Sequence, residues 1–317
     1  MFLDQVKKGQ TSVSAYIPSF VLIVIAFIAG QFLSGILLTV VAAAKGGINM
    51  DALSTMDFEA MGISSNLGFF ILMLGFLPAF FGLFFARGFH KRPFKTFITS
   101  RPKPDFRRIG FAMLIWGLIL AGSTVIDYIM DPENYIVTFE PASFLWLLLI
   151  ALVFFPFQIG FEEIFFRGYL YQMFGNLFRY PVISWIVTSV LFGLMHSGNP
   201  EIHEYGFWVM MPGYILLGAF LGLITILDDG LEMALGIHFI NNFFLGVGVN
   251  YAGSAIKVNS AFQVLTIDPS YQWVGILISG AIFTVVAWFV YKFDGFRKFI
   301  QPLKLKDDAD LDMHGIL

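Results

Sequence analysis

Apolar residues are grouped into long runs along this chain, and short polar segments separate the runs. A membrane-spanning helix needs about 20 apolar residues, whereas the core of a signal peptide has about 7 to 15. The first run, residues 12–44, is therefore too long for a signal peptide and is typical of a span. The runs predict eight transmembrane helices, at residues 12–44, 67–85, 109–130, 141–175, 181–196, 206–227, 231–249 and 273–293. The predicted fold class is an all-α, polytopic membrane helical bundle.

The composition supports this assignment. Hydrophobic residues make up 57% of the 317 residues and charged residues 13%, whereas soluble domains have roughly 45 to 50% and 25%. The mean hydropathy is +0.77, which indicates a membrane protein. The sequence shows no internal repeat and no linker, so we expect a single membrane domain over residues 1–317.

Basic residues are concentrated in a connector at residues 87–108 and in the tail after Phe293. Positive charge marks the cytoplasmic side of a membrane protein, so both segments are expected in the cytoplasm. Eight spans agree with this, because an even number of crossings separates the connector from the tail. We expect both termini in the cytoplasm and the protein in the plasma membrane of a prokaryote.

Two further features narrow the function. The net charge of −3 gives no indication of a nucleic-acid partner. The chain has no cysteine, which excludes disulfides, thiolate metal ligands and a cysteine nucleophile.

Residues 160–175, GFEEIFFRGYLYQMFG, place two carboxylates and an arginine in an apolar setting. A carboxylate at the centre of a bilayer costs roughly 2.5 to 3.5 kcal/mol, so such residues often mark a functional site. In a helix, Glu163 and Arg167 share one face and can form an ion pair, while Glu162 points about 100° away. We expect a structural Glu163/Arg167 pair and a Glu162 that is available to a substrate or a water. The alternative is a solvated helix end among the lipid headgroups.

Three other polar residues lie in apolar helices: His196, His238 and Asn242. His238 and Asn242 share a helix face because they are four residues apart. If the fourth and fifth helices form a hairpin that turns near Arg179, Glu162 and His196 are each 17 residues from the turn. Both then lie about 25 Å from the turn, level with each other. Single histidines in membrane helices are usually packing residues, but this grouping favours a shared site.

These side chains suit hydrolysis of an amide by an activated water. A carboxylate with a histidine can hold and deprotonate water, and a histidine with an amide can donate hydrogen bonds to an oxyanion. The sequence has no G-x-S-G motif, no spaced pair of intramembrane aspartates and no H-E-x-x-H motif. Two alternatives remain open. One is a zinc peptidase with Glu162, His196 and His238 as ligands. The other is a scaffold, immunity or transport protein that uses the same fold without catalysis.

Three motifs follow one another in successive predicted helices: Glu162-Glu163-x-x-x-Arg167, Phe192-x-x-x-His196 and His238-x-x-x-Asn242. They resemble the signature of the CAAX protease and bacteriocin-processing family, also called Abi, which includes the CAAX prenyl endopeptidases. The resemblance covers residues 162–242. It divides the domain into N-terminal helices at 1–140, catalytic helices at 141–250 and a last helix with a basic tail at 251–317.

The resemblance implies an eight-helix intramembrane glutamic endopeptidase without a metal cofactor. Glu162 and His196 would activate water, and His238 and Asn242 would stabilise the oxyanion. The supporting positions would be Glu163, Arg167 and Phe192. The implied partners are membrane lipids and a membrane-associated protein or peptide substrate, which the sequence does not identify.

Overall fold

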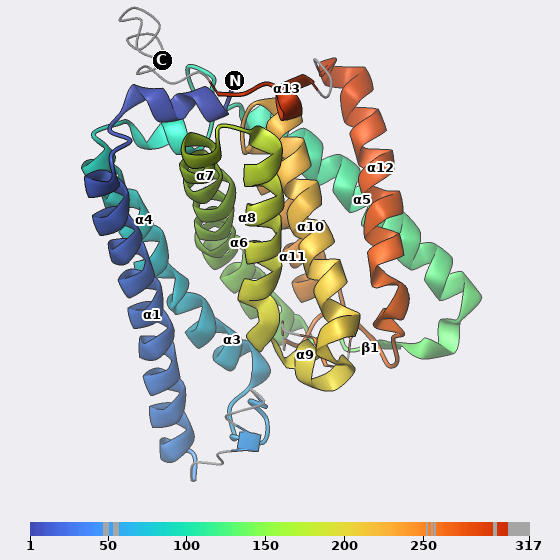
Figure 1. The fold of residues 1–317 in the computed structure, drawn as a ribbon. Helices are drawn as coiled ribbons and strands as arrows, with labels where there is room; N and C mark the ends of the chain where they lie inside the picture. The colour runs from blue at the N-terminus through green and yellow to red at the C-terminus, as the bar shows by residue number, and fades with distance from the viewer. Residues whose placement is uncertain are drawn as a thin grey trace, which may run out of the picture.

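The computed structural model is a bundle of long helices that run between two faces (Figure 1). It describes residues 1–46, 51–52, 57–251, 253–254, 256, 258–293 and 297–303. Seven helical segments among these residues are long and apolar enough to cross a membrane: Val13–Ala44, Ser65–His90, Phe106–Met130, Pro141–Phe178, Pro181–Gly198, Phe207–Asp228 and Pro269–Tyr291. The predicted polytopic helical bundle is confirmed.

The seven segments are built from the following elements: α1 (Val13–Ala44), α3 (Ser65–Leu74), α4 (Phe76–His90), α5 (Phe106–Met130), α6 (Pro141–Glu163), α7 (Tyr171–Phe178), α8 (Pro181–Met195), α10 (Phe207–Asp228) and α12 (Gln272–Tyr291). The π-helical turn η4 (Ile164–Leu170) joins α6 to α7. The short elements are η1 (Leu3–Lys8), η2 (Phe94–Phe97), η3 (Pro132–Asn134), η5 (His196–Gly198), α9 (Pro200–Tyr205), η7 (Pro269–Tyr271) and α13 (Arg297–Ile300).

The predicted helix at 231–249 is present but short. It consists of α11 (Glu232–Phe243) and the π-helical turn η6 (Phe244–Gly248). The helix α11 packs against α5, α6 and α10, so neighbouring helices cover most of its surface. A helix enclosed in this way can carry polar side chains within the membrane without presenting them to lipid. With the seven longer segments, it completes the expected bundle of about eight membrane helices.

The second span is interrupted between α3 and α4 at Gly75. A Cβ built on Gly30 of α1 would lie 2.0 Å from the Gly75 carbonyl oxygen, so the two backbones approach too closely for any side chain at Gly30. This contact joins α1 to the middle of the second span.

The predicted hairpin of the fourth and fifth helices is confirmed. The helix α7 ends at Phe178, Arg179 adopts a left-handed backbone conformation with φ 64°, and α8 begins at Pro181. Proline is well suited to the first turn of a helix because its missing N–H has no partner there. The two helices pack side by side (Figure 1).

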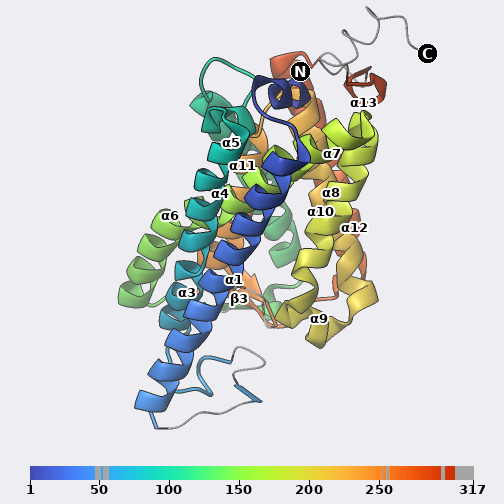
Figure 2. The same cartoon turned by 60° about the vertical axis from the view of Figure 1, so that its left-hand side comes forward.

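We call the two ends of the bundle the terminal face and the loop face. The terminal face carries the N-terminus, η2, the α7–α8 turn and α13, and the loop face carries α9 and a small sheet (Figures 1 and 2). The sheet has the strand order β1-β3-β2, with β1 (Tyr135–Val137), β2 (Val249–Tyr251) and β3 (Phe262–Val264). The strand β3 pairs antiparallel with β1 and parallel with β2. This sheet ties the segment before α6 to the segment after α11.

The basic connector packs onto the terminal face through ion pairs. Arg101 contacts Glu232 through Nη1 at 3.0 Å and Asp228 through Nη2 at 3.1 Å. Arg108 also pairs with Asp228. The side chains of Asp228 and Glu232 are fully buried, so the two arginines compensate charges that would otherwise be costly to bury.

Candidate active site

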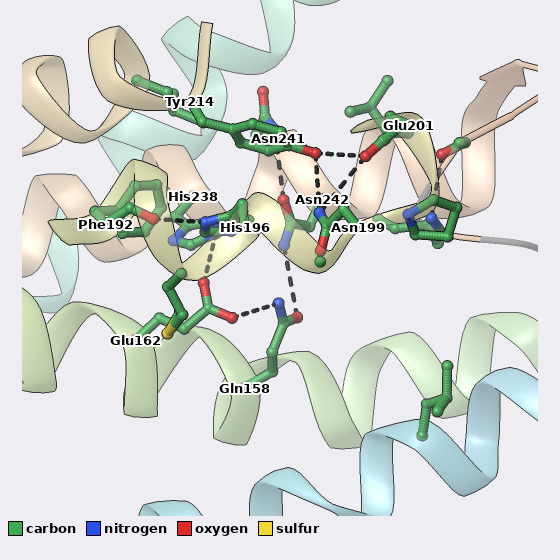
Figure 3. Close-up of a pocket in the computed structure, with 18 of the residues that line it drawn as sticks. Gln158, Glu162, Phe192, His196, Asn199, Glu201, Tyr214, His238, Asn241 and Asn242 are labelled. Atoms are coloured by element: carbon green, nitrogen blue, oxygen red, sulfur yellow. Dashed lines mark hydrogen bonds and ion pairs between the residues drawn. The ribbon is translucent and has the colours of Figure 1, made fainter. Parts of the chain in front are cut away.

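Five of the seven residues singled out from the sequence line one cavity of about 410 Å³: Glu162, Phe192, His196, His238 and Asn242. The other two, Glu163 and Arg167, are buried next to it with exposed fractions of 0% and 1%. This burial contradicts the alternative of a solvated helix end. The structure therefore brings the predicted residues together (Figure 3), while their chemical roles stay predictions.

The two carboxylate oxygens of Glu162 have different surroundings: one accepts a hydrogen bond and the other has no hydrogen-bond partner among the described residues. Its Oε1 accepts a hydrogen bond of 2.9 Å from Gln158 Nε2, one turn earlier on α6. Its Oε2 is buried and has no hydrogen-bond partner among the described residues. That oxygen lies 3.6 Å from His238 Nε2, which is longer than a direct hydrogen bond. A buried carboxylate oxygen without a partner is costly, and it is suited to receive a proton or a water.

Glu163 joins the predicted ion pair to the site. Its Oε1 accepts from Arg167 Nη1 at 2.8 Å, which confirms the pair expected from their spacing. The same oxygen lies 2.7 Å from His238 Nδ1. An ionised carboxylate can only accept, so His238 Nδ1 donates and the ring is fixed with Nε2 directed at Glu162. Glu163 is thus more than a structural partner of Arg167, because it also orients His238.

Arg167 is held by groups other than Glu163. Its Nη2 donates to the carbonyl oxygen of Gly218 on α10 at 3.0 Å. Its guanidinium lies over the ring of Phe192, 4.1 Å from the centroid. A guanidinium over an aromatic face is favourable, and more so away from water. Phe192 therefore links the Arg167 pair to the helix that precedes His196.

His196 follows the last residue of α8. Its Nδ1 lies 2.7 Å from the carbonyl oxygen of Phe192, which can only accept, so Nδ1 carries the proton in this bond. In the neutral ring, Nε2 is then an acceptor. The imidazole stacks on Tyr214 of α10, with ring centroids 4.6 Å apart and an interplanar angle of 21°. The backbone bond and the stacking contact together fix the orientation of His196.

Gln158 connects the two sides of the site and was not singled out from the sequence. Its Nε2 donates to Glu162, and its Oε1 lies 3.5 Å from Asn242 Nδ2 (Figure 3). One amide thus contacts both the proposed base and the proposed oxyanion donor. Its spacing of four residues from Glu162 is the signal that would have found it.

A second group of polar residues missed by the sequence analysis surrounds Glu201 at the loop face. Tyr214 donates from its hydroxyl to Glu201 Oε2, and Tyr251 donates to Glu201 Oε1 at 2.8 Å. Burial and the adjacent Glu201 carboxylate raise the pKa of Tyr251, so its hydroxyl stays protonated and donates. Asn199 Nδ2 donates to the Tyr214 hydroxyl at 2.9 Å. Because Tyr214 stacks on His196, this group extends the site from His196 to the loop face.

The described residues contain no group of three His, Cys, Asp or Glu side chains placed to hold a metal ion. The zinc alternative with Glu162, His196 and His238 needs such a group. Chelation of the purified protein distinguishes a metal-free mechanism from a zinc mechanism.

The comparison with known proteins agrees with this geometry. Residues 141–244 match the family model described as Type II CAAX prenyl endopeptidase Rce1-like. The match contains every motif position, so the resemblance to CAAX-type proteases is confirmed over these residues. The fold is that of a multi-pass membrane protein, and its residues 141–244 are similar to the Type II CAAX prenyl endopeptidase Rce1-like family.

One relative covers nearly the whole chain. The protein YyaK of Bacillus subtilis strain 168, described as uncharacterized, is 29% identical over 290 residues, which are 90% of this chain and 94% of YyaK. The likeness therefore extends to helices outside the family model. No solved structure matches the chain.

Proposed function

We propose that this protein is an intramembrane endopeptidase that hydrolyses a peptide bond of a membrane-associated protein or peptide. The observation that carries the proposal is the buried Glu162 Oε2, which has no hydrogen-bond partner among the described residues and belongs to a side chain that lines the cavity with His196, His238 and Asn242. We place the protein in the plasma membrane of a prokaryote.

Glu162 and His196 would activate the water. The water oxygen attacks the carbonyl carbon of the scissile peptide, and Glu162 takes the proton that the water loses. His196 Nε2, an acceptor when Nδ1 donates to Phe192, orients the same water. When the intermediate collapses, the C–N bond breaks and the proton on Glu162 passes to the leaving nitrogen. The products are a carboxylic acid and an amine, and Glu162 returns to its carboxylate form.

His238 and Asn242 would stabilise the negative charge that develops on the carbonyl oxygen. The Asn242 amide nitrogen is a donor at the cavity wall. When His238 is protonated, Nε2 can donate to the oxyanion while Nδ1 still donates to Glu163. Donors that are already in place cost no reorganisation when charge develops, which is why such sites contribute strongly to catalysis.

The remaining cavity wall is mostly apolar. One side of this wall is formed by aromatic and aliphatic residues of α1, the second span and α6: Phe27, Phe69, Leu72, Met73, Phe76 and Phe155. A wall of this kind can exclude water from the reacting groups and accommodate an apolar side chain of a substrate. These features support a polypeptide substrate that reaches the site within the membrane.

A substrate search tests the proposal. Cells that produce the wild-type protein are compared with cells that produce equal amounts of Glu162→Gln, by mass spectrometry of membrane proteins and released peptides. The expected result is a set of new termini that depends on Glu162. A complete absence of such termini, with both proteins folded and abundant, would favour the scaffold or transport alternative.

A further inference from the structure

Positive charge is divided very unequally between the two faces of the bundle. Of the 16 lysine and arginine residues that the structure describes, only Lys45 belongs to a segment that joins helices at the loop face. Arg167 is buried within the bundle. The rest lie before α1, between α4 and α5 or at their ends, in the α7–α8 turn and after α12. The described parts of these segments belong to the terminal face (Figures 1 and 2). The positive-inside rule therefore orients the terminal face toward the cytoplasm.

The candidate active site is displaced toward the loop face. Its cavity is lined by residues 198–201, at the end of η5 and the start of α9. It is also lined by Tyr251 of β2, by Ser254, and by Gln272 at the start of α12. No described residue of the segments at the terminal face lines it.

A second cavity continues from the site cavity into the loop face. It has a volume of about 270 Å³ and shares Tyr251, Ser254 and Ile256 with the first. Its other lining residues are mainly polar and include Gln263 of β3 and Thr138, which follows β1. A polar cavity at this position can hold hydrated backbone, which is tolerated at membrane depth only where protein or water surrounds it.

The path from the site to the terminal face is filled with side chains. Beyond Glu163 on the same helical segment, Phe166, Arg167, Tyr169 and Gln172 are all buried. Gln172 is fixed by a hydrogen bond from its Nε2 to the Thr96 carbonyl oxygen at 2.9 Å. Close packing of this kind leaves no room for a peptide segment.

We propose that the substrate enters from the loop face, and that this face lies outside the cytoplasm. The substrate class is then the non-cytoplasmic segment of an exported or membrane-anchored polypeptide. The inference rests on the proposed endopeptidase function and adds the side from which the scissile segment arrives. It excludes a soluble cytoplasmic tail as the substrate, because such a tail would meet the closed terminal face.

Orientation is tested first, and the cysteine-free chain makes the experiment direct. Single cysteines are introduced by His203→Cys and Ser270→Cys at the loop face and by Lys103→Cys at the terminal face, all at exposed positions. Intact cells are treated with a membrane-impermeant maleimide. The two loop-face cysteines should react in intact cells, and the Lys103→Cys protein only after the membrane is permeabilised. The opposite pattern would overturn the inference whatever the protein catalyses.

The second arm locates the cleaved bonds. Termini that depend on Glu162 should map to segments outside the cytoplasm or to released peptides. Glu162-dependent termini confined to cytoplasmic segments would overturn the entry side and leave the endopeptidase function standing. A lack of any Glu162-dependent cleavage would contradict the proposed function, and this inference with it, even with the maleimide pattern as expected.

Discussion

Two groups of buried charge in the bundle are built differently. At the terminal face, Asp228 and Glu232 are fully buried and pair with Arg101, and Asp228 pairs with Arg108 as well. One oxygen of Asp228 has no hydrogen-bond partner among the described residues, yet this side chain lines neither the site cavity nor the second cavity. These charges join the connector to the helices α10 and α11.

In the candidate active site, by contrast, the charges are only partly paired. Glu163 has Arg167 and His238 as partners, whereas Glu162 has an amide on one oxygen and a cavity beside it. Removing one partner of a buried pair destabilises a protein, because the other charge is left uncompensated. Removing a carboxylate that lacks a compensating cation should not carry this penalty. Burial alone therefore does not identify a functional charge in this bundle, and the adjoining cavity is the feature that distinguishes Glu162.

Variants in the two groups should differ in what they change, activity or stability. Among them, Asn242→Ala in the candidate active site should have the largest effect. Loss of one oxyanion donor should lower kcat on the order of 10² to 10³-fold without abolishing cleavage. Asn242→Asp keeps the size and shape of the side chain and removes the N–H donor, so it should be similarly slow. Steady-state kinetics of the purified proteins measures both, and a fast Asn242→Asp protein would contradict the donor role.

Arg101→Gln should lower the free energy of unfolding and leave the catalytic rate unchanged. It leaves the buried Glu232 carboxylate without its cation, and loss of one partner in such a pair costs about 3 kcal/mol of unfolding free energy. Turnover per folded molecule should stay near the wild-type value. Denaturant unfolding in detergent measures the loss, with Lys103→Gln at an exposed neighbouring position as the control. Equal stability of the two variants would show that the terminal-face pairs do not hold the fold.

Gln158→Leu should have a smaller effect. It removes the hydrogen bond to Glu162 and the longer contact with Asn242, each worth about 1 kcal/mol or less. The expected loss in kcat is therefore roughly 10-fold, since about 1.4 kcal/mol corresponds to a factor of ten. The KM should change little, because Gln158 orients the two groups that react. A pure rise in KM would instead assign Gln158 to substrate binding.

Chelation should have no effect if the mechanism is metal-free. Purified protein is dialysed against a strong zinc chelator and assayed before and after Zn²⁺ is added back. Loss of cleavage with rescue by Zn²⁺ would favour the zinc alternative, because metal sites release their ion to chelators and regain it.

The membrane helices were predictable because the bilayer forces long apolar runs into helices. The second span was predicted at residues 67–85 and extends over Ser65–His90, with an interruption at Gly75. That interruption lies at a close contact with α1, which is distant in sequence and leaves no local pattern. The Glu163/Arg167 pair was predictable because it depends only on the geometry of one helix.

Other parts of the site depend on packing between helices and were not predictable. Tyr214 reaches His196 only because α10 packs beside α8, and a tyrosine in an apolar helix carries no sign of such a role. The contact between Glu163 and His238 likewise joins α6 to α11. The sequence analysis therefore found the charged residues around Glu162 and missed Glu201, Gln158 and Tyr214, whose contacts with the site depend on the fold or were not recognised.

The most direct test of the proposed mechanism compares purified Glu162→Gln with the purified wild-type protein in two measurements: thermal unfolding in detergent and cleavage of an identified substrate. Glu133→Gln removes an exposed carboxylate at the loop face and serves as the control. We expect Glu162→Gln to unfold near the wild-type temperature and to cleave at least 10²-fold more slowly, roughly the contribution of a general base. A well-folded Glu162→Gln protein that cleaves at nearly the wild-type rate would contradict the assignment of Glu162 as the base.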